Sequence, residues 1–317
     1  MPRVKPLARA VVSASILAVI LYLIDANDVL ATIARADVGA VAIAVGFALS
    51  SQLFSAARLH RLALLQDIAL SLGRVFLIGL SAVFYGLIVP GGTVAAFVVR
   101  FVQLSDEARA ESVAAALIVD RVIATIFLIV VGTIAIAFDQ AEPLWAGIVV
   151  AVSLLGAGIL LFGRRMIVRL IDRPVSISEQ HTPGKLRGFA KRFSLALARY
   201  SRAGNAQFLF VFAASLLAHL CGCATYYVIA NGMGLDVTFL SVCWIRSGMI
   251  LATMIPISIG GLGLREVAAI ALLAPLGVGE AQAVGFSILI FFIAPVIVGL
   301  IGGLGELLSL GRRGRPA

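Results

Sequence analysis

Charged residues are scarce in this chain. They account for 13% of its 317 residues, against 61% for hydrophobic residues, whereas soluble globular proteins carry roughly 25% charged residues. With a mean hydropathy of +1.09, the chain has more apolar surface than one soluble core of this length can bury. The composition therefore excludes a soluble globular domain and predicts an all-α, polytopic transmembrane helix bundle.

Residues that commonly build catalytic or metal sites are also few. The chain has three cysteines, Cys221, Cys223 and Cys243, and all lie within apolar runs, which argues against a secreted disulfide framework. His219 and Cys223 share a helical face at a spacing that a metal could use, but no further ligands cluster near them, so we expect no metal and no cofactor. The sequence contains no P-loop and no nucleophile with an accompanying base. It therefore predicts neither an ATP-driven pump nor a catalytic constellation.

Acidic residues are outnumbered by basic ones, 16 to 25, which gives a formal net charge of +9. In a soluble protein this excess would suggest a nucleic-acid partner, but here the basic residues gather between apolar runs, where the positive-inside rule accounts for them. The segment 163–205 holds ten basic and two acidic residues, and the loop 58–71 holds Arg58 and Arg61 against Asp67. Placing the basic segments in the cytoplasm predicts a multi-pass membrane protein with both termini cytoplasmic and no nucleic-acid partner.

Apolar runs give the expected organisation of the chain. About 20 apolar residues are needed to span a bilayer, and eight runs predict full spans: 9–24, 38–57, 72–89, 112–137, 143–162, 206–230, 237–255 and 283–305. Two shorter runs, 93–104 and 266–278, predict broken or re-entrant helices. The expected arrangement is a single integral membrane domain over 1–317, with helical groups 9–162 and 206–305, a cytoplasmic basic loop 163–205 and a basic tail 306–317.

The basic segment 163–205 has two interpretations. It is either a solvated linker that orients the protein in the membrane, or it contains an amphipathic surface helix near 185–202 that binds anionic headgroups.

Two predicted spans end in similar breaks. The residues of these breaks are Pro90, Gly91 and Gly92 in the first, and Pro256, Gly260, Gly261 and Gly263 in the second. Irregular backbone at membrane depth survives only inside protein or beside a water-filled cavity, and paired broken helices mark the binding sites of transporters. The similarity predicts an internal repeat, although chance is an alternative because Pro and Gly are common in membrane helices. A broken helix also presents backbone N–H groups that can hold an anion.

Among the charged residues in or beside these apolar runs, six are the candidate site residues, since charge at membrane depth is costly and is a functional candidate by default. They are Arg100, Asp120, Arg121, Arg246, Arg265 and Glu266. Arg246 is the most obvious partner for Asp120, with Arg100 and Glu266 as alternatives. Such residues can serve only to fix helix packing. In the functional interpretation, the four arginines attract an anionic headgroup, while the two carboxylates balance charge or take protons.

These motifs resemble a known family. The second break with its Glu266, the earlier segment 90–100 and the intramembrane Asp120 and Arg121 resemble the lysylphosphatidylglycerol synthase transmembrane, or flippase-like, family of UPF-type membrane proteins. The resemblance extends over residues 10–305. It implies that the membrane domain translocates lipid, whereas in bifunctional members a separate soluble domain makes an aminoacyl lipid. We expect no such synthesis here. Relatives often carry an acidic residue before the position of Arg100, and 93–99 contains none.

The sequence thus predicts a translocase for a polar-headed lipid or lipid-linked glycan. Its expected partners are membrane lipids with anionic or glycosylated headgroups, together with lipid-synthesis enzymes. One alternative is a membrane-embedded glycosyl- or acyltransferase acting on a lipid carrier, for which Asp120 and Glu266 are the candidate bases. Another is a non-transporting scaffold of a lipid-synthesis complex. Charge-neutralising variants, assayed for product formation and for product location, separate these functions.

Overall fold

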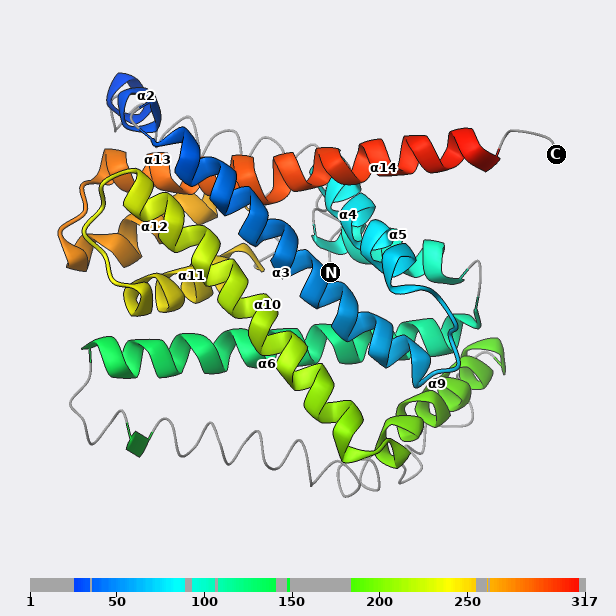
Figure 1. The fold of residues 1–317 in the computed structure, drawn as a ribbon. Coiled ribbons are helices and arrows are strands. Elements are labelled where there is room, and N and C mark those ends of the chain that lie inside the picture. The colour runs from blue at the N-terminus through cyan, green and yellow to red at the C-terminus, as the bar shows by residue number, and fades with distance from the viewer. Residues whose placement is uncertain are drawn as a thin grey trace.

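The secondary structure is helical throughout the part of the chain that the computed structural model describes, which comprises residues 26–34, 36–88, 93–105, 108–140, 147–148, 184–254, 261 and 263–313 (Figure 1). The helices are α2 (Ala26–Ala34), α3 (Val38–Leu64), α4 (Leu72–Ile88), α5 (Thr93–Ser105), α6 (Ala110–Gln140), α9 (Gly184–Arg202), α10 (Asn205–Gly232), α11 (Phe239–Thr253), α12 (Leu264–Leu273), α13 (Glu280–Phe291) and α14 (Val298–Arg313). A 3-10 turn, η1 (Ala274–Leu276), follows α12, and a π-helical turn, η2 (Phe292–Ile297), joins α13 to α14.

Four of the described helical segments are long and apolar enough to cross a membrane: Val38–Leu64, Ala110–Gln140, Asn205–Gly232 and Glu280–Glu306. These helices fit an all-helical integral membrane protein. The predicted number of eight full spans is not confirmed. The runs 72–89 and 237–255 form α4 and α11, which have 17 and 15 residues, fewer than the roughly 20 that a span needs. The run 9–24 and most of 143–162 lie outside the described residues.

The first long helix, α3, extends seven residues past its predicted end at 57. At its start, the side chain of Asp37 accepts hydrogen bonds from the backbone N–H groups of Gly39 (3.0 Å) and Ala40 (3.3 Å), which satisfies donors that a helix start leaves free. The helix continues to Leu64, so Arg58 and Arg61 belong to it and not to a loop. This boundary matters for the site described below.

The centre of the molecule is an antiparallel pair, α3 and α10, which both lie diagonally in Figure 1 between upper left and lower right, with the start of α10 past α6 and beside α9. The start of α3 meets the end of α10, where the Asp37 N–H donates to the Gly232 carbonyl at 3.0 Å. Further along, the Ser51 hydroxyl donates to the Ala218 carbonyl at 2.8 Å. These two contacts, 14 residues apart on each helix, fix both the direction and the register of the pair.

Two further antiparallel pairs flank this centre, and both use small residues for close approach. On α14, Gly302 lies against α4 so closely that an added Cβ would sit 2.3 Å from the Leu80 carbonyl. On α6, a Cβ at Gly132 would sit 2.5 Å from the Cβ of Ser247 in α11. Asp139 then ends this second pair by accepting hydrogen bonds from α11, including one from the Trp244 indole at 2.9 Å.

The contacts among helices α3 to α6 resemble the contacts among helices α10 to α14. If α3 is exchanged with α10, α4 with α11, α5 with α12, and α6 with the α13–α14 segment, the contacts map onto one another. Thus α4 packs on α14 as α11 packs on α6, α4 contacts α5 as α11 contacts α12, and α3 contacts α4 as α10 contacts α11. Because α3 and α10 are antiparallel, the two groups of helices run in opposite directions.

Most of the described part of the basic segment 163–205 forms the helix α9, which agrees with the helix of the second interpretation, while its binding to anionic headgroups stays a prediction. This helix docks on the ends of α3 and α6: the Tyr200 hydroxyl donates to the Leu62 carbonyl at 3.1 Å, and the Gln66 amide donates to the Ala196 carbonyl at 2.8 Å. Arg192 and Glu111 add an ion pair to α6. The helix is therefore attached to the bundle by its own polar contacts.

Candidate functional site

A cavity of about 520 Å³ lies between α3, α4, α5, α6, α10 and α11. The described residues that line it are Ser51, Gln52, Ser55 and Arg58 of α3, Val83 of α4, Val94, Ala96, Phe97 and Arg100 of α5, Leu117, Asp120, Arg121 and Ala124 of α6, Ala218 and His219 of α10, and Arg246 of α11. Four arginines face one aspartate in this lining, a formal excess of three positive charges. Like charges gathered in a low-dielectric site repel one another and attract an anion.

Asp120 is neutralised by Arg58, not by the predicted partner Arg246. The Nε of Arg58 donates to the Asp120 carboxylate at 2.6 Å, and the two residues are 4% and 5% exposed. The prediction was wrong because Arg58 was assigned to a loop, whereas α3 continues through it and carries its side chain into the bundle. The pair fixes α3 against α6, and breaking such a buried pair typically costs about 3–5 kcal/mol.

Arg246 is held at the cavity by α10. Its Nη1 lies 3.3 Å from the Nδ1 of His219, while the Nε2 of the same ring lies 2.9 Å from the Ala124 carbonyl. A carbonyl can only accept, so Nε2 carries the proton and Nδ1 accepts from Arg246. Both His219 nitrogens are therefore used by protein groups, which leaves neither for the metal considered from the sequence.

A missing side chain makes room for the Arg246 guanidinium. A Cβ built on Gly222 of α10 would lie 2.4 Å from Nη2 and 2.6 Å from Cζ of Arg246, closer than real atoms approach. On another side, the guanidinium carbon lies 5.8 Å from the centroid of the Tyr226 ring, within the range of a cation–π contact. Gly222 and Tyr226, four residues apart on α10, thus shape the seat of this arginine.

Two of the four arginines have hydrogen-bonding capacity left over. The Nε atoms of Arg100 and Arg246 are buried, and neither has an acceptor within the described part of the chain. A buried charged donor without a partner is costly, and a guanidinium binds phosphate or carboxylate oxygens through two parallel hydrogen bonds. Arg121 also lines the cavity and is more exposed. The cavity lining is therefore suited to attract an anionic group, for which Arg100 and Arg246 have donors to spare.

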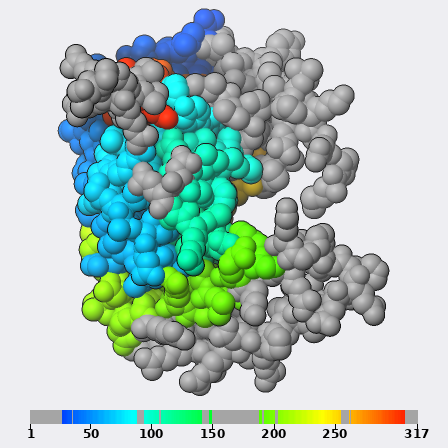
Figure 2. Space-filling view, turned by 90° about the vertical axis from the view of Figure 1, so that its right-hand side faces the viewer, coloured from blue at the N-terminus to red at the C-terminus, as the bar shows by residue number. Residues whose placement is uncertain are grey.

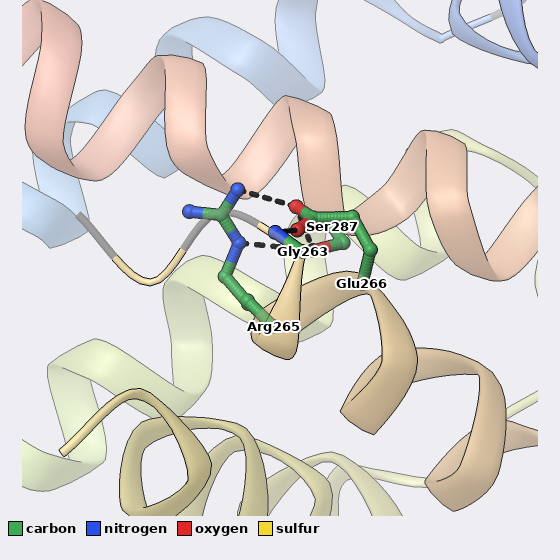
Figure 3. Close-up of polar contacts among 4 residues, drawn as sticks. All are labelled: Gly263, Arg265, Glu266 and Ser287. Atoms are coloured by element: carbon green, nitrogen blue, oxygen red, sulfur yellow. Dashed lines mark hydrogen bonds and ion pairs between the residues drawn. The ribbon is translucent and has the colours of Figure 1, made fainter. Parts of the chain in front are cut away.

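Arg265 and Glu266 do not line this cavity; they form a separate buried cluster with Ser287 (Figure 3). Arg265 donates to the Glu266 carboxylate at 2.6 Å and to the Ser287 hydroxyl at 2.9 Å, and Ser287 donates to the same carboxylate at 3.0 Å. The guanidinium also lies 4.5 Å from the centroid of the Phe291 ring. The contacts with Ser287 and Phe291 join α12 to α13, so the cluster acts as a clamp between them.

The start of α12 is closed by the chain itself. Glu266 accepts a hydrogen bond from the Gly263 N–H at 2.6 Å, so its carboxylate occupies the place where the broken helix was expected to receive an anion. Gly261 and Gly263 have φ angles of 79° and 87°, which favour glycine. Of the other predicted break residues, Pro256 and Gly260, together with Pro90, Gly91 and Gly92, lie outside the described residues.

The structure therefore brings four of the six predicted charged residues to one cavity, namely Arg100, Asp120, Arg121 and Arg246, and sets two apart. Sequence analysis missed Arg58 and His219 as parts of this lining. A signal for Arg58 was present: polar residues recur on one face of α3 at positions 51, 55 and 58, the spacing of a helical stripe. A polar stripe inside an apolar helix indicates a buried polar surface.

Comparison with known proteins gives two matches. The family described as "Lysylphosphatidylglycerol synthase TM region" matches residues 7–302. A UPF0104 membrane protein of Pyrococcus horikoshii is 31% identical over 151 residues, which are 46% of this chain and 43% of the relative. The matched part thus spans less than half the length of that relative.

Proposed function

This chain belongs to the lysylphosphatidylglycerol synthase transmembrane-region family, and from that premise we propose that it is a flippase-like translocase that moves lipids with an anionic headgroup between the leaflets of a bacterial inner membrane. The observation that carries the proposal is the cavity with three excess positive charges, in which the buried Nε atoms of Arg100 and Arg246 have no acceptor within the described residues. A lipid phosphate supplies the missing acceptors.

The cavity residues divide the work of holding such a headgroup. Arg58 and Asp120 satisfy each other at 2.6 Å and keep α3 and α6 in register. His219 and Gly222 position Arg246 from α10. Arg100 approaches from α5, so the phosphate is bound by residues of two different short helices. Because the site lies among apolar helices, each charge-assisted hydrogen bond acts in a low-dielectric environment and is strong.

Exchange between leaflets requires the site to open to each side in turn, and the helix contacts support an inverted repeat that does this. Transporters built from inverted repeats alternate between two states by rocking one repeat against the other. Three charged residues of the cavity, Arg100, Asp120 and Arg121, come from α5 and α6, and the counterparts of these helices under the exchange are α12 and α13. That place is filled by the Arg265–Glu266–Ser287 cluster. The proposed mechanism alternates between this arrangement and its inverse, in which the α12–α13 clamp opens.

The transferase alternative requires a carboxylate that a substrate can reach. Asp120 is bound to Arg58, and Glu266 is 0% exposed with hydrogen bonds from Gly263, Arg265 and Ser287. Both candidate bases are thus engaged. The scaffold alternative differs from the proposal in what it expects of charge-neutralising variants, which would leave its function intact. The proposal also includes lipid-synthesis enzymes that supply the substrate. It places α9 and both termini in the cytoplasm.

A leaflet-exchange assay tests this function. The purified protein is reconstituted in phosphatidylcholine vesicles with tail-labelled fluorescent phosphatidylglycerol, and a membrane-impermeant quencher reports the labelled lipid that reaches the outer leaflet. We expect exchange by the unmodified protein, and a rate lower by about tenfold or more in Arg100→Gln or Arg246→Gln, since a lost charge-assisted hydrogen bond is worth roughly 1.5–3 kcal/mol.

The matched control is Arg109→Gln, which neutralises an exposed arginine outside the cavity lining and should leave the rate unchanged. A folded, monodisperse protein that exchanges no anionic lipid would overturn the proposal. Cavity variants as fast as the control would do the same.

A further inference from the structure

A second hollow lies beside the cationic cavity. It is a groove of about 380 Å³ between α5, α6 and α9, and its described lining is entirely apolar. The main contributors are Phe97, Phe101, Ala114, Ile118, Phe189 and Phe193. The rings of Phe189 and Phe193 stack with an interplanar angle of 8°. Figure 2 shows this side of the molecule, where the cyan-to-teal atoms of α5 and α6 lie next to the bright green atoms of α9.

The groove and the cavity adjoin each other. Phe97 lines both of them. On α5, Arg100 of the cavity lies three residues after Phe97 and directly before Phe101 of the groove. On α6, Ile118 of the groove lies two residues before Asp120 of the cavity. A cationic volume and an apolar volume thus share one wall, within about one helical turn of each other.

We propose that this groove, called the acyl groove below, holds an acyl chain of the same lipid whose anionic headgroup occupies the cavity. The inference rests on the proposed function, which assigns the headgroup to the cavity, and it adds a binding region for the acyl chain. Water gains no hydrogen bonds in an apolar groove and does not favour it. The acyl chains of lipids are the apolar molecules that surround a membrane protein, and they can fill such a groove. An amphiphile, with an anionic group joined by a few bonds to an apolar chain, matches the two adjoining volumes.

The site is therefore specific for a long-chain anionic lipid and not for a soluble anion of similar headgroup. An acyl chain held beside α9 stays in apolar surroundings while its headgroup enters the cavity. Chain length then contributes to binding independently of the arginines. Phe97, which belongs to both volumes, lies where the headgroup and the chain meet.

The test compares two phosphatidylglycerol probes that differ in their chains. Binding of the dioleoyl and dihexanoyl forms to the purified protein in detergent is measured by native mass spectrometry. Ile118→Trp places a large ring in the groove. We expect it to weaken binding of the dioleoyl form by about tenfold, the effect of losing contact with roughly two methylene groups, and to leave binding of the dihexanoyl form unchanged.

Ile129→Trp is the matched control. It changes the same residue type on the same helix at a similar exposure, 46% against 41% for Ile118, but outside the groove, and should affect neither probe. If Ile118→Trp weakens both probes equally or neither, the acyl groove is overturned. If neither probe binds in a manner that depends on Arg100 and Arg246, the proposed function itself fails, which is a different result.

A second measurement locates the acyl chain in the unmodified protein and is then repeated with Arg100→Gln. A phosphatidylglycerol with a photoreactive diazirine near the end of one chain is cross-linked in nanodiscs, and the labelled peptides are identified. We expect labelling of the segments that contain Phe101, Ile118 and Phe193, and loss of that labelling in Arg100→Gln. Labelling confined to other lipid-facing helices, or unaffected by Arg100→Gln, contradicts a shared lipid.

Discussion

At the scale of single residues, the position of Arg246 depends on the lack of a side chain at Gly222. The guanidinium occupies the space that a Cβ of residue 222 would fill, at 2.4 Å from Nη2, and it is directed toward the cavity by His219. A glycine in the middle of a helix is otherwise unfavourable by about 0.5–1 kcal/mol relative to alanine. Its presence in α10 is explained by the arginine it accommodates.

Gly222→Ala should displace Arg246 and weaken binding of phosphatidylglycerol by about tenfold, the loss of one charge-assisted hydrogen bond. Lipid binding by native mass spectrometry and the melting temperature of the purified protein check this expectation. Gly46→Ala is the control, since Gly46 lies within α3 with no atom within 4 Å of its built Cβ. Equal behaviour of the two variants would show that Arg246 does not depend on Gly222.

The same cavity should discriminate between headgroups by charge. Asp120 is the one carboxylate among its described lining residues, and Arg58 already binds it. The ammonium group of an aminoacylated lipid would meet arginines without an acidic partner, and like charges brought together in an interface cost several kcal/mol. We expect phosphatidylglycerol to bind at least about tenfold more tightly than lysylphosphatidylglycerol.

Competition between the two lipids in native mass spectrometry measures this preference. Arg121→Glu adds a carboxylate to the lining and should move the preference toward the aminoacylated lipid, whereas Arg109→Glu, outside the lining, should not. Equal affinities for the two headgroups in the unmodified protein would contradict the charge argument.

At the scale of helices, composition predicted most elements, while side-chain partners decided the boundaries. The apolar run 38–57 predicted α3, but its end was placed at the first arginine, because a charge in a single sequence marks a loop. Arg58 instead binds Asp120, and Arg61 lies 4.9 Å from the centroid of the Phe210 ring on α10. Both partners are distant in sequence, so no local pattern could reveal them.

The break before α12, in contrast to the end of α3, was located correctly from the sequence. Its glycines and its Arg265–Glu266 pair were singled out from the sequence, and Gly261 and Gly263 do adopt positive φ. What the sequence could not supply is Ser287 from α13, which completes the cluster. With that residue in place, each polar group has a local partner, and the geometry favours a structural clamp.

Glu266→Gln tests the clamp. Arg265, only 6% exposed, would lose its carboxylate, and leaving one member of a buried pair unpaired typically costs about 3–5 kcal/mol. We expect a lower melting temperature and unchanged affinity for phosphatidylglycerol at the cavity, which Glu266 does not line. Ser287→Ala should show the same pattern with a smaller loss of stability. A variant of normal stability that fails to bind lipid would assign Glu266 to the headgroup site.

At the scale of the whole molecule, the arrangement of contacts says more than any single span. The order of the apolar runs predicted two groups of helices but not how they pack. The contacts relate the groups by exchange, with α4 on α14 matching α11 on α6, and the antiparallel α3 and α10 set their directions opposite. The two groups differ in their polar residues, since α3, α5 and α6 of the first supply most charged residues of the cavity, whereas α12 and α13 of the second hold the sealed Arg265–Glu266 cluster.

If leaflet exchange requires the sealed half to open, locking α12 to α11 should stop transport without preventing binding. Gly248 and Leu272 provide the site, because a Cβ built on Gly248 lies 2.7 Å from a Leu272 methyl group. In the variant Gly248→Cys with Leu272→Cys, a short bis-thiol reagent cleavable by reduction should reduce leaflet exchange to the background of protein-free vesicles, and reduction should restore it. Each single variant treated with the same reagent controls for the native cysteines. Phosphatidylglycerol binding to the cross-linked protein should persist, because neither Gly248 nor Leu272 lines the cavity and α12 contributes no residue to its described lining. Exchange at the untreated rate in fully cross-linked protein would mean that α12 does not move during transport, and the two halves would then be related by packing alone.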